Sequence, residues 1–240
     1  MGIFVKVPII LHKSTERGLT KFKWLESVHS FSFGRYVNTQ RTGFGTLAVF
    51  NDDTIAPQKG FSTHPHDNME IITLVIEGTV QHQDSIGSKT DITAGEVQTM
   101  TAGTGVAHSE INPSDTQPVH LFQIWIEPRE YGLKPRYQQK RFEQELFKNR
   151  LYPIVSGEKS KDNLTINQDA SLFRGDLELG MIILYHLNPR RGLFVFSVEG
   201  SVKVNDQMIS SRDSLEIKEV PSLTLTALSA AKLIVIEIPL

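Results

Sequence analysis

Two short motifs, His64-Pro65-His66 and His108-Ser109-Glu110, contain side chains that bind transition metals. In each motif the two polar side chains are two positions apart, and on a β-strand this spacing places them on the same face. Two neighbouring strands could then direct three imidazoles and one carboxylate at one point. A divalent transition metal binds such a set of three nitrogens and one oxygen. The spacing predicts a metal site and favours an enzyme over a scaffold.

The residues around these motifs fit a site that is open to a substrate. Pro65 has no amide hydrogen to donate to a neighbouring strand, which indicates an edge strand or a bulge. Gly103 and Gly105 precede His108 and allow a tight turn or a close approach of the backbone. Four protein ligands leave two positions of an octahedron for water, oxygen or a chelating substrate. A catalytic metal needs such open positions.

Glu70 is a second candidate for the carboxylate ligand. It has the same parity as His64 and His66, so on a continuous strand it would share their face. Spacing alone does not separate Glu70 from Glu110, and both stay candidates at this point.

The remaining histidines are weaker candidates. His82 lies on an alternating strand and fits a place beside the cavity as well as one on the surface. A packing or hydrogen-bonding role is expected for His120. Ordinary roles are expected for His12 and His29, and His186 lies in an apolar strand of the second half.

Several phenylalanines are concentrated in the first part of the chain. For any one of them, a place in the hydrophobic core is the expected role. Some apolar lining is still expected around a site that binds a flat organic molecule. The candidates are Phe31, Phe33, Phe44, Phe50 and Phe61.

Short segments rich in Val, Ile, Thr and aromatic residues alternate with turn residues, which predicts an all-β sandwich or barrel. Asn51-Asp52-Asp53 and residues 101–105 are interpreted as turns. Helical periodicity is best in residues 140–151, where Phe142 and Leu146 predict one short helix. The expected strands are 46–50, 69–77, 96–101, 119–127, 177–187, 193–198, 201–204, 222–228 and 233–238.

One internal similarity indicates two copies of a β-module. Residues 74–80, Leu-Val-Ile-Glu-Gly-Thr-Val, resemble residues 196–202, Phe-Ser-Val-Glu-Gly-Ser-Val, and each predicts a strand, a Glu-Gly turn and a second strand. The second copy lacks the histidine pair, so one module would bind metal and the other would be structural. The polar region 132–163 is interpreted as the junction.

Composition limits the alternatives. The 240 residues carry a formal net charge of −2, which gives no electrostatic reason to expect nucleic acid or a membrane surface as partner. The chain has no cysteine, which excludes disulfides and thiolate ligands and fits a reducing compartment. Residues 1–13 lack the pattern of a secretory signal, and no stretch approaches a membrane span. A cytoplasmic location is expected.

The motifs together resemble the pirin family of the cupin superfamily, with close similarity over roughly residues 24–140. The residues that carry the resemblance are Ser30-Phe31-Ser32-Phe33-Gly34, Asn51-Asp52-Asp53, residues 60–71 around His64-Pro65-His66, Glu77-Gly78, residues 82–87, residues 101–110 ending in His108-Ser109-Glu110, and residues 119–126 followed by Pro128. The second half matches loosely, and Arg212-Asp213 replaces a common Gly-Asp.

The resemblance implies a bicupin, with two antiparallel β-barrels and one metal in the first. It implies that His64, His66, His108 and Glu110 hold this metal, which favours Glu110 over Glu70. The expected domains are residues 1–135, which bind the metal, and residues 136–240, a linker and a cupin domain without ligands. A monomer is expected.

The bacterial pirins that the chain resembles imply a quercetin 2,3-dioxygenase. The small aromatic substrate would react with O₂, and ring opening would release carbon monoxide and leave a depside. Glu110 would act as general base as well as ligand. Fe(II) is the expected metal, with copper, nickel, cobalt and manganese as alternatives. The rival hypotheses are a regulatory module that docks to a protein partner and a cupin enzyme with another small substrate.

Overall fold

Residues 8–240 are described here from a computed structural model. Within this range the chain forms 22 strands and two short 3₁₀ helices, so the prediction of an all-β protein is confirmed. None of the helices in the described range is long and apolar enough to cross a membrane. Part of the N-terminal stretch from which a secretory signal was judged absent, residues 1–7, lies outside the described residues.

Contacts divide the chain into two compact units. The N-terminal unit contains Arg17–Gln144 and Ile154–Ala170, and the C-terminal unit contains the described residues up to Glu16, Glu145–Pro153 and Ser171–Leu240. The expected boundary after residue 135 stays a prediction. In the structure, each unit contains segments from both sides of residue 135. β1 (Ile9–His12) pairs with a strand of the C-terminal unit, whereas Arg136 donates a hydrogen bond to the Thr165 carbonyl within the N-terminal unit.

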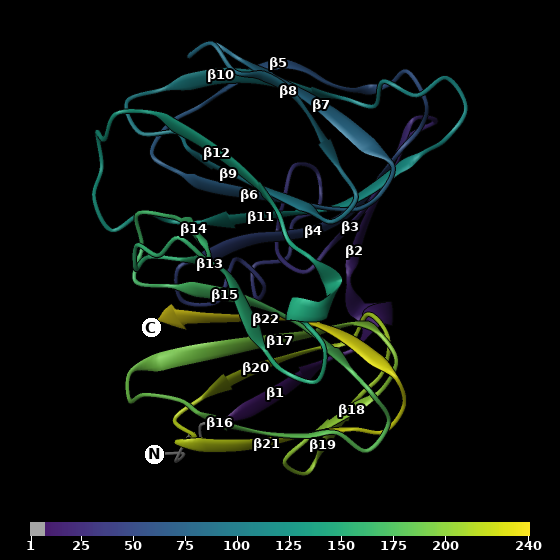
Figure 1. The fold of residues 1–240 in the computed structure, drawn as a ribbon, viewed down its shortest axis with the longest axis vertical. Coiled ribbons are helices and arrows are strands. Elements are labelled where there is room, and N and C mark those ends of the chain that lie inside the picture. Colours follow the sequence, from purple (N-terminus) through teal and green to yellow (C-terminus); the bar gives the residue numbers. More distant parts are fainter. Residues whose placement is uncertain (1–7) are drawn as a thin grey trace. The chain divides into compact units, whose positions relative to one another are not determined.

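The N-terminal unit contains a larger and a smaller antiparallel sheet (Figure 1). The larger sheet has the order β12-β9-β6-β11-β4-β3-β2, and the smaller one has the order β5-β10-β7-β8. Their bounds are β2 (Gly18–Lys21), β3 (Leu25–His29), β4 (Leu47–Ile55), β5 (Gly60–His66), β6 (Glu70–Glu77), β7 (Thr79–Asp84), β8 (Lys89–Thr93), β9 (Glu96–Thr101), β10 (Val106–Ile111), β11 (Val119–Ile126) and β12 (Arg136–Arg141).

The interior of this unit changes from apolar to polar along its strands. Ile55, Val75 and Val80 belong to an apolar cluster that fills one part of the barrel. Two residues before Val75 on β6, Thr73 hydrogen-bonds to Gln123 of β11 at 3.2 Å, and both side chains are buried. Buried polar groups require partners and are costly otherwise. Their presence inside the barrel therefore marks the part of the interior that binds polar groups.

The C-terminal unit repeats this architecture with an apolar interior. One sheet contains β1-β20-β17-β22-β15 and then β13, of which only Tyr152 and Pro153 belong to this unit, and the other contains β16-β21-β18-β19. Leu223 and Leu225 of β21 belong to a large apolar core of the unit. The bounds are β13 (Tyr152–Ser156), β15 (Ser171–Leu177), β16 (Ile182–His186), β17 (Arg191–Glu199), β18 (Val202–Val204), β19 (Gln207–Ile209), β20 (Ser214–Lys218), β21 (Ser222–Ala227) and β22 (Ala231–Pro239). The remaining β14 (Leu164–Thr165) pairs in parallel with Val155 and Ser156.

The predicted repeat is present in the structure. Gly78 connects β6 to β7 and Gly200 connects β17 to β18, with φ angles of 78° and 79°. At each glycine an added Cβ would meet a backbone carbonyl, that of Pro118 or that of Ala230. The two Glu-Gly turns therefore have the same conformation, and glycine is required there by both angle and space.

Two of the local predictions were wrong. The helix predicted over residues 140–151 is absent: β12 continues to Arg141, and only Gln144–Leu146 form a 3₁₀ turn. Phe142 is buried after the strand rather than on a helix face. The segment 177–187 is two strands, because Gly180 turns the chain between β15 and β16 with a φ of 83°.

A third correction concerns Asn51-Asp52-Asp53, which was interpreted as a turn. These residues lie within β4, where Asn51 pairs with Gln123 and Asp53 pairs with Leu121. Asn51 and Asp53 are almost completely buried. Polar residues that usually indicate turns here occupy a strand because their side chains line a cavity instead of a hydrophobic core.

We expect Gly103→Ala to destabilise the protein by at least about 3 kcal/mol, and Gly34→Ala by about 1–2 kcal/mol. Both glycines have left-handed φ angles, 50° and 56°. A Cβ on Gly103 would overlap the Leu133 carbonyl oxygen, whereas no atom of the described residues lies within 4 Å of one on Gly34. Urea denaturation measures the free energy of unfolding of both variants and of the wild type. Equal losses would show that the backbone angle alone, and not the close approach to Leu133, requires Gly103.

Candidate metal centre

The two histidine-containing motifs lie on neighbouring strands, as predicted. β5 and β10 pair antiparallel, with His108 opposite His64 and a bulge between His108 and Glu110. β5 is the edge strand of its sheet, in agreement with the interpretation of Pro65. The pairing thus brings together side chains that are more than forty residues apart in the sequence.

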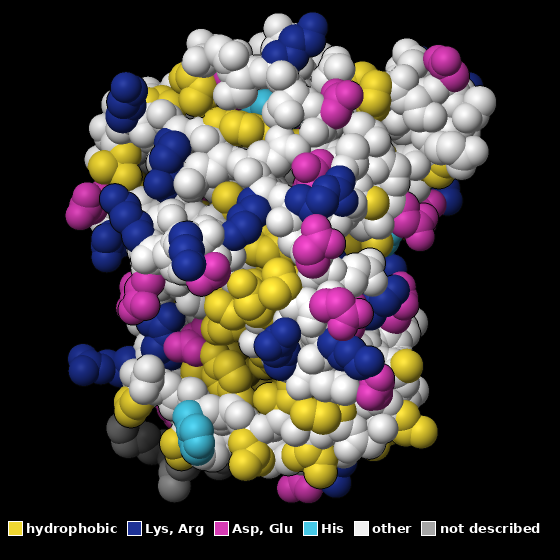
Figure 2. Space-filling view, in the orientation of Figure 1, with side chains coloured by type: hydrophobic (Ala, Val, Ile, Leu, Met, Phe, Trp, Pro, Cys, Tyr) yellow, Lys and Arg dark blue, Asp and Glu magenta, His cyan; other side chains and the backbone are white. Residues whose placement is uncertain are grey.

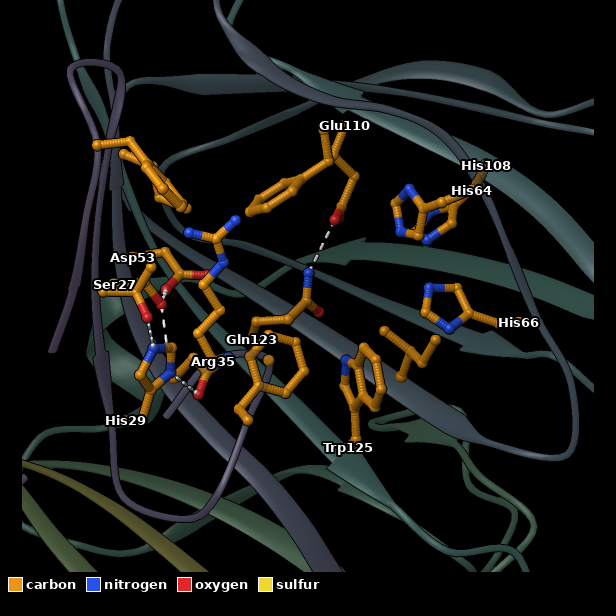
Figure 3. A pocket seen from close by; sticks show the side chains of 18 residues that line it. Ser27, His29, Arg35, Asp53, His64, His66, His108, Glu110, Gln123 and Trp125 are labelled. Carbon is orange, nitrogen blue, oxygen red and sulfur yellow. Dashed lines mark hydrogen bonds between the residues drawn. The ribbon is translucent and has the colours of Figure 1, made fainter. Parts of the chain in front are cut away.

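Three imidazoles converge on one point at the pocket wall (Figure 3). The ring centroid of His64 lies 4.8 Å from that of His66 and 4.5 Å from that of His108, and His66 and His108 are 4.9 Å apart. One nitrogen of each histidine lies within 4.8 Å of one nitrogen of each of the others. Three nitrogen donors at this separation could hold a metal ion.

Hydrogen bonding assigns the free nitrogen of His64. Its Nδ1 lies 2.8 Å from the Ser62 carbonyl oxygen. Because a carbonyl oxygen only accepts, Nδ1 carries the proton and donates it. The Nε2 lone pair of His64 is therefore available, and the hydrogen bond also fixes the orientation of the ring.

A chain of three side chains does the same for His108. His82 Nε2 lies 3.0 Å from Asp84 Oδ2, and His82 Nδ1 lies 3.4 Å from His108 Nδ1. Burial raises the pKa of Asp84, but hydrogen bonds from His82 and Ser88 outweigh it and hold the pKa below its usual range. The ionised Asp84 accepts from His82 Nε2, so the neutral His82 presents a bare Nδ1 that accepts from His108 Nδ1. His108 Nε2 is left as a lone pair.

His108 Nε2 is the atom that most clearly requires a partner. It is buried and has no hydrogen-bond partner among the described residues. An unpaired buried polar atom costs about 1–3 kcal/mol. A cation bound between the three imidazoles would supply the missing interaction, so the donor set fits a metal ion.

His66 and His108 are in the protonation state that a metal requires. Burial, together with the neighbouring histidines, lowers the pKa of His108 to about 3. Burial and the nearby His64 lower the pKa of His66 to about 4. Both imidazoles are therefore neutral at physiological pH, and no proton has to leave them when a cation binds.

Glu110 lies beside these imidazoles with its carboxylate held by two neutral donors. Thr73 Oγ1 lies 3.1 Å from Oε1, and Gln123 Nε2 donates to Oε2 at 2.8 Å. Burial raises the pKa of Glu110 to about 7, against the effect of both hydrogen bonds. Its carboxylate groups with His82 and His108 rather than with His64 and His66. Glu110 therefore combines a place at the centre with a pKa suited to moving protons near neutral pH.

Glu70 is placed elsewhere, in a separate buried environment. Its Oε2 accepts a hydrogen bond from Thr101 Oγ1 at 2.8 Å, and its Oε1 is buried without a partner among residues 8–240. Parity failed because Asn68, with a φ of 43°, lies in the turn between β5 and β6. Residues 64, 66 and 70 do not share one strand, so Glu70 is not part of the histidine group.

A cavity of about 320 Å³ opens beside the three imidazoles. Its walls include the rings of Phe22, Phe33, Phe61 and Trp125, and the Trp125 ring lies 4.9 Å from that of His66. Of the phenylalanines considered from sequence, Phe33 and Phe61 therefore line the cavity, while the other three are buried in the core: Phe31, Phe44 and Phe50. The cavity has the size and the largely apolar walls of a small-molecule site.

The far side of the cavity carries polar groups that spacing did not identify (Figure 3). Ser27 Oγ donates to Asp53 Oδ1, and His29 Nδ1 donates to Asn51 Oδ1 at 2.8 Å. These side chains are at most 3% exposed. Arg35, from the segment between β3 and β4, also lines the cavity. The cavity thus has polar groups on two sides and aromatic walls between them.

A two-barrel fold with this histidine group in the first barrel defines a bicupin. The family model "Pirin" matches residues 12–126, and the model of a "Quercetinase C-terminal cupin domain" matches residues 153–238. A protein of Escherichia coli strain K12 named "Quercetin 2,3-dioxygenase" is 41% identical over 231 residues, 96% of this chain and 99% of that protein. A "Pirin-like protein" of Caulobacter vibrioides is 38% identical and covers 89% of this chain and 92% of that protein.

Solved structures agree with the sequence matches. The crystal structure of the bacterial pirin YhhW from E. coli in complex with nickel(II) has a TM-score of 0.92 and 40% identity, covering 96% of this chain and 99% of that one. The chain belongs to the pirin family.

Proposed function

We propose that this protein binds one divalent transition metal through His64, His66 and His108, with Glu110 supplying a carboxylate oxygen. The observation that supports this most directly is the buried Nε2 of His108, which has no hydrogen-bond partner among the described residues and lies beside two other imidazoles. The nickel(II) complex of YhhW gives further support from a relative. We propose Fe(II) as the physiological ion, with nickel, copper, cobalt and manganese as the alternatives to compare.

We further propose that the protein is a quercetin 2,3-dioxygenase, which opens the heterocycle of a flavonol with O₂ and releases carbon monoxide and a depside. A divalent metal at the centre would supply a Lewis acid that lowers the pKa of the flavonol 3-hydroxyl. The names of the E. coli and other bacterial relatives support this substrate. The flat aromatic walls of the cavity support a planar ligand.

The residues of the chain have distinct tasks in this reaction. Once the substrate has displaced it as a ligand, the Glu110 carboxylate accepts the proton of the 3-hydroxyl, because burial raises its pKa to about 7 and lets it be ionised before and protonated after the transfer. Gln123 and Thr73 hold the carboxylate in place. Phe61 and Trp125 hold the planar substrate and exclude water from the reacting carbons.

The test is direct. Protein loaded anaerobically with each of the five metals is mixed with quercetin in air, and the flavonol absorbance is followed together with carbon monoxide release. Loss of absorbance with one carbon monoxide per quercetin supports the proposal. A fully metallated protein that leaves quercetin unchanged would contradict the dioxygenase function, while the metal content itself tests the first proposal separately.

The chain from Asp84 to His108 gives a prediction of its own. An asparagine at position 84 keeps Oδ1 for the amides of Ile86 and Ser88 but presents an NH₂ group to His82 Nε2. His82 must then accept at Nε2 and donate from Nδ1, and His108 must carry its proton on Nε2, where the metal would bind. We expect Asp84→Asn to weaken metal binding by about 10–100-fold.

The measurement is a competition titration with a coloured chelator, and the control is Asp91→Asn. Asp91 is an exposed acid on β8 that bonds to Gln81, so its substitution should leave the metal affinity unchanged. ¹⁵N chemical shifts of the imidazoles report the tautomer of His108 in the metal-free protein. If the Asp84→Asn protein keeps the wild-type tautomer and metal affinity, the hydrogen bonds from Asp84 through His82 do not determine the tautomer of His108.

A further inference from the structure

Asp53 is a buried carboxylate whose hydrogen bonding is incomplete. Its side chain lines the cavity, and the residue is 2% exposed. Oδ1 accepts a hydrogen bond from Ser27 Oγ, and within residues 8–240 no other group donates to this carboxylate. A buried carboxylate with a purely structural role normally has partners for both oxygens. One oxygen of Asp53 is therefore an acceptor that the protein itself does not use.

His29, beside Ser27 on the same wall of the cavity, uses both of its nitrogens within the protein. His29 donates from Nδ1 to Asn51 Oδ1, and its Nε2 lies 2.9 Å from Thr20 Oγ1. Burial lowers the pKa of His29, so the imidazole is neutral and both of its nitrogens have partners. These contacts fix the wall of the cavity around Ser27 and Asp53 without supplying a second donor to the carboxylate.

Arg35 brings a cation to the same cavity. Its side chain is exposed, and its one described interaction is the contact of the guanidinium with the Phe22 ring, 5.9 Å from the ring centroid. No acid is within ion-pair distance of Arg35 among the residues that the structure describes. Figure 3 shows Arg35 and Asp53 on the side of the cavity away from His66. The free donors of Arg35 and the free acceptor of Asp53 thus line one cavity.

We propose that Asp53 and Arg35 form a subsite for a phenolic hydroxyl, on the part of the substrate remote from the oxygens that face the histidines. The hydroxyl would donate its proton to the free oxygen of Asp53 and accept a hydrogen bond from Arg35. This inference rests on the proposed function, because it gives a specificity to the same cavity.

The two charges favour a neutral polar group. A substrate carboxylate is attracted by Arg35 but repelled by Asp53, and an ammonium is attracted by Asp53 but repelled by Arg35, so neither matches the pair as a whole. A hydroxyl is neutral and is both donor and acceptor, so it matches the pair. A hydrocarbon ring at this position would leave the buried acceptor of Asp53 unpaired, and the site would discriminate against it.

The experiment compares two flavonols that share the 3-hydroxyl and the 4-keto oxygen. Quercetin carries hydroxyls on both outer rings, and 3-hydroxyflavone carries none. Dissociation constants are measured on zinc-loaded protein, in which no turnover consumes the ligand, by quenching of tryptophan fluorescence. We expect the wild-type protein to bind quercetin at least about tenfold more tightly, the effect of one hydrogen bond to a charged group.

Three variants assign this preference. In Asp53→Leu and in Arg35→Ala we expect the ratio of the two dissociation constants to fall towards one. Asp53→Asn, which keeps an acceptor for Ser27, serves if the leucine variant does not fold, and should give an intermediate ratio. Lys23→Ala is the matched control, because Lys23 is an exposed cation outside the cavity lining, and it should keep the wild-type ratio.

The outcomes separate this inference from the proposed function. If the wild type binds both flavonols equally well, or if the variants weaken both by the same factor, the subsite is overturned while the flavonol site stands. If the wild type binds neither flavonol, both proposals fall. Where quercetin is preferred, galangin identifies the end of the flavonol that reaches Asp53, because it differs from quercetin only in lacking the hydroxyls of the phenyl ring on C2.

Discussion

Alanine in place of His108 is expected to weaken metal binding by at least about 1000-fold, more than the 10–100-fold effect of losing an outer hydrogen-bond partner. Quercetin turnover should be lost with the metal. The reason is geometric: His108 lies opposite His64 on the paired strands, and its buried Nε2 lone pair has no partner within residues 8–240. Elemental analysis and equilibrium titration measure the metal, and absorbance measures the turnover.

A thermal scan separates loss of the metal from loss of the fold. Metal at about a hundred times its dissociation constant stabilises a protein by ~2.7 kcal/mol. We expect added metal to raise the melting temperature of the wild type but not that of His108→Ala. His186→Ala is the control, since His186 is an exposed histidine bonded to Ser222 in the C-terminal unit. If His108→Ala retains stoichiometric metal, the three-histidine centre is wrong.

The histidine group could be predicted because it depends on local rules. Spacing of two residues on a strand places His64 and His66 on one face whatever the rest of the fold does. The repeat around Gly78 and Gly200 was visible for a similar reason, because a Glu-Gly turn needs a left-handed residue and glycine supplies it.

The choice between Glu70 and Glu110 was not local, and spacing left it open. It depends on where the strand ends, and the turn at Asn68 changes the face on which Glu70 lies. The family resemblance favoured Glu110, and the structure places its carboxylate beside His108. Residue parity is informative only within one strand.

The polar wall of the cavity was missed because its residues resemble a turn. Asn and Asp are depleted in strands, yet Asn51 and Asp53 lie in β4, where their side chains form the polar part of the cavity wall instead of facing a hydrophobic core. Gln123 and Thr73 meet at Glu110 from strands that are 50 residues apart. Local preference fails at these positions because the site, rather than the fold, determines the residue type.

Replacing Glu110 by glutamine is expected to lower kcat by about 10²–10⁴-fold, the usual contribution of a general base. Metal affinity should fall less than in His108→Ala, by about 10–100-fold, because the three imidazoles remain. The amide keeps the size of the side chain and can still bond to Thr73 and Gln123, so the fold is preserved. This split between turnover and metal binding distinguishes a base from a group that acts only as a ligand.

The pH dependence of kcat tests the same assignment of Glu110 as the base. A base must be ionised. Burial raises the pKa of Glu110 to about 7, and a divalent cation beside it lowers the pKa again, so wild-type kcat should fall as the pH decreases from 7. Protonation of His66 and His108 belongs near pH 4 and 3 and does not produce this limb. In Glu110→Gln the limb that Glu110 produces near pH 7 should vanish from the residual activity. Any limb from ionisation of the substrate should be the same in both proteins.

Glu70→Gln is the matched control for this prediction. Burial also raises the pKa of Glu70 to about 7, but Glu70 lies outside the cavity and bonds to Thr101. Its substitution should leave the kcat profile with the wild-type limb. If Glu110→Gln retained full turnover, or if Glu70→Gln removed the limb, then the proton would be accepted elsewhere. A cavity with two buried carboxyl groups would in that case direct attention to Asp53, the other acid that lines it with a pKa raised by burial to about 7.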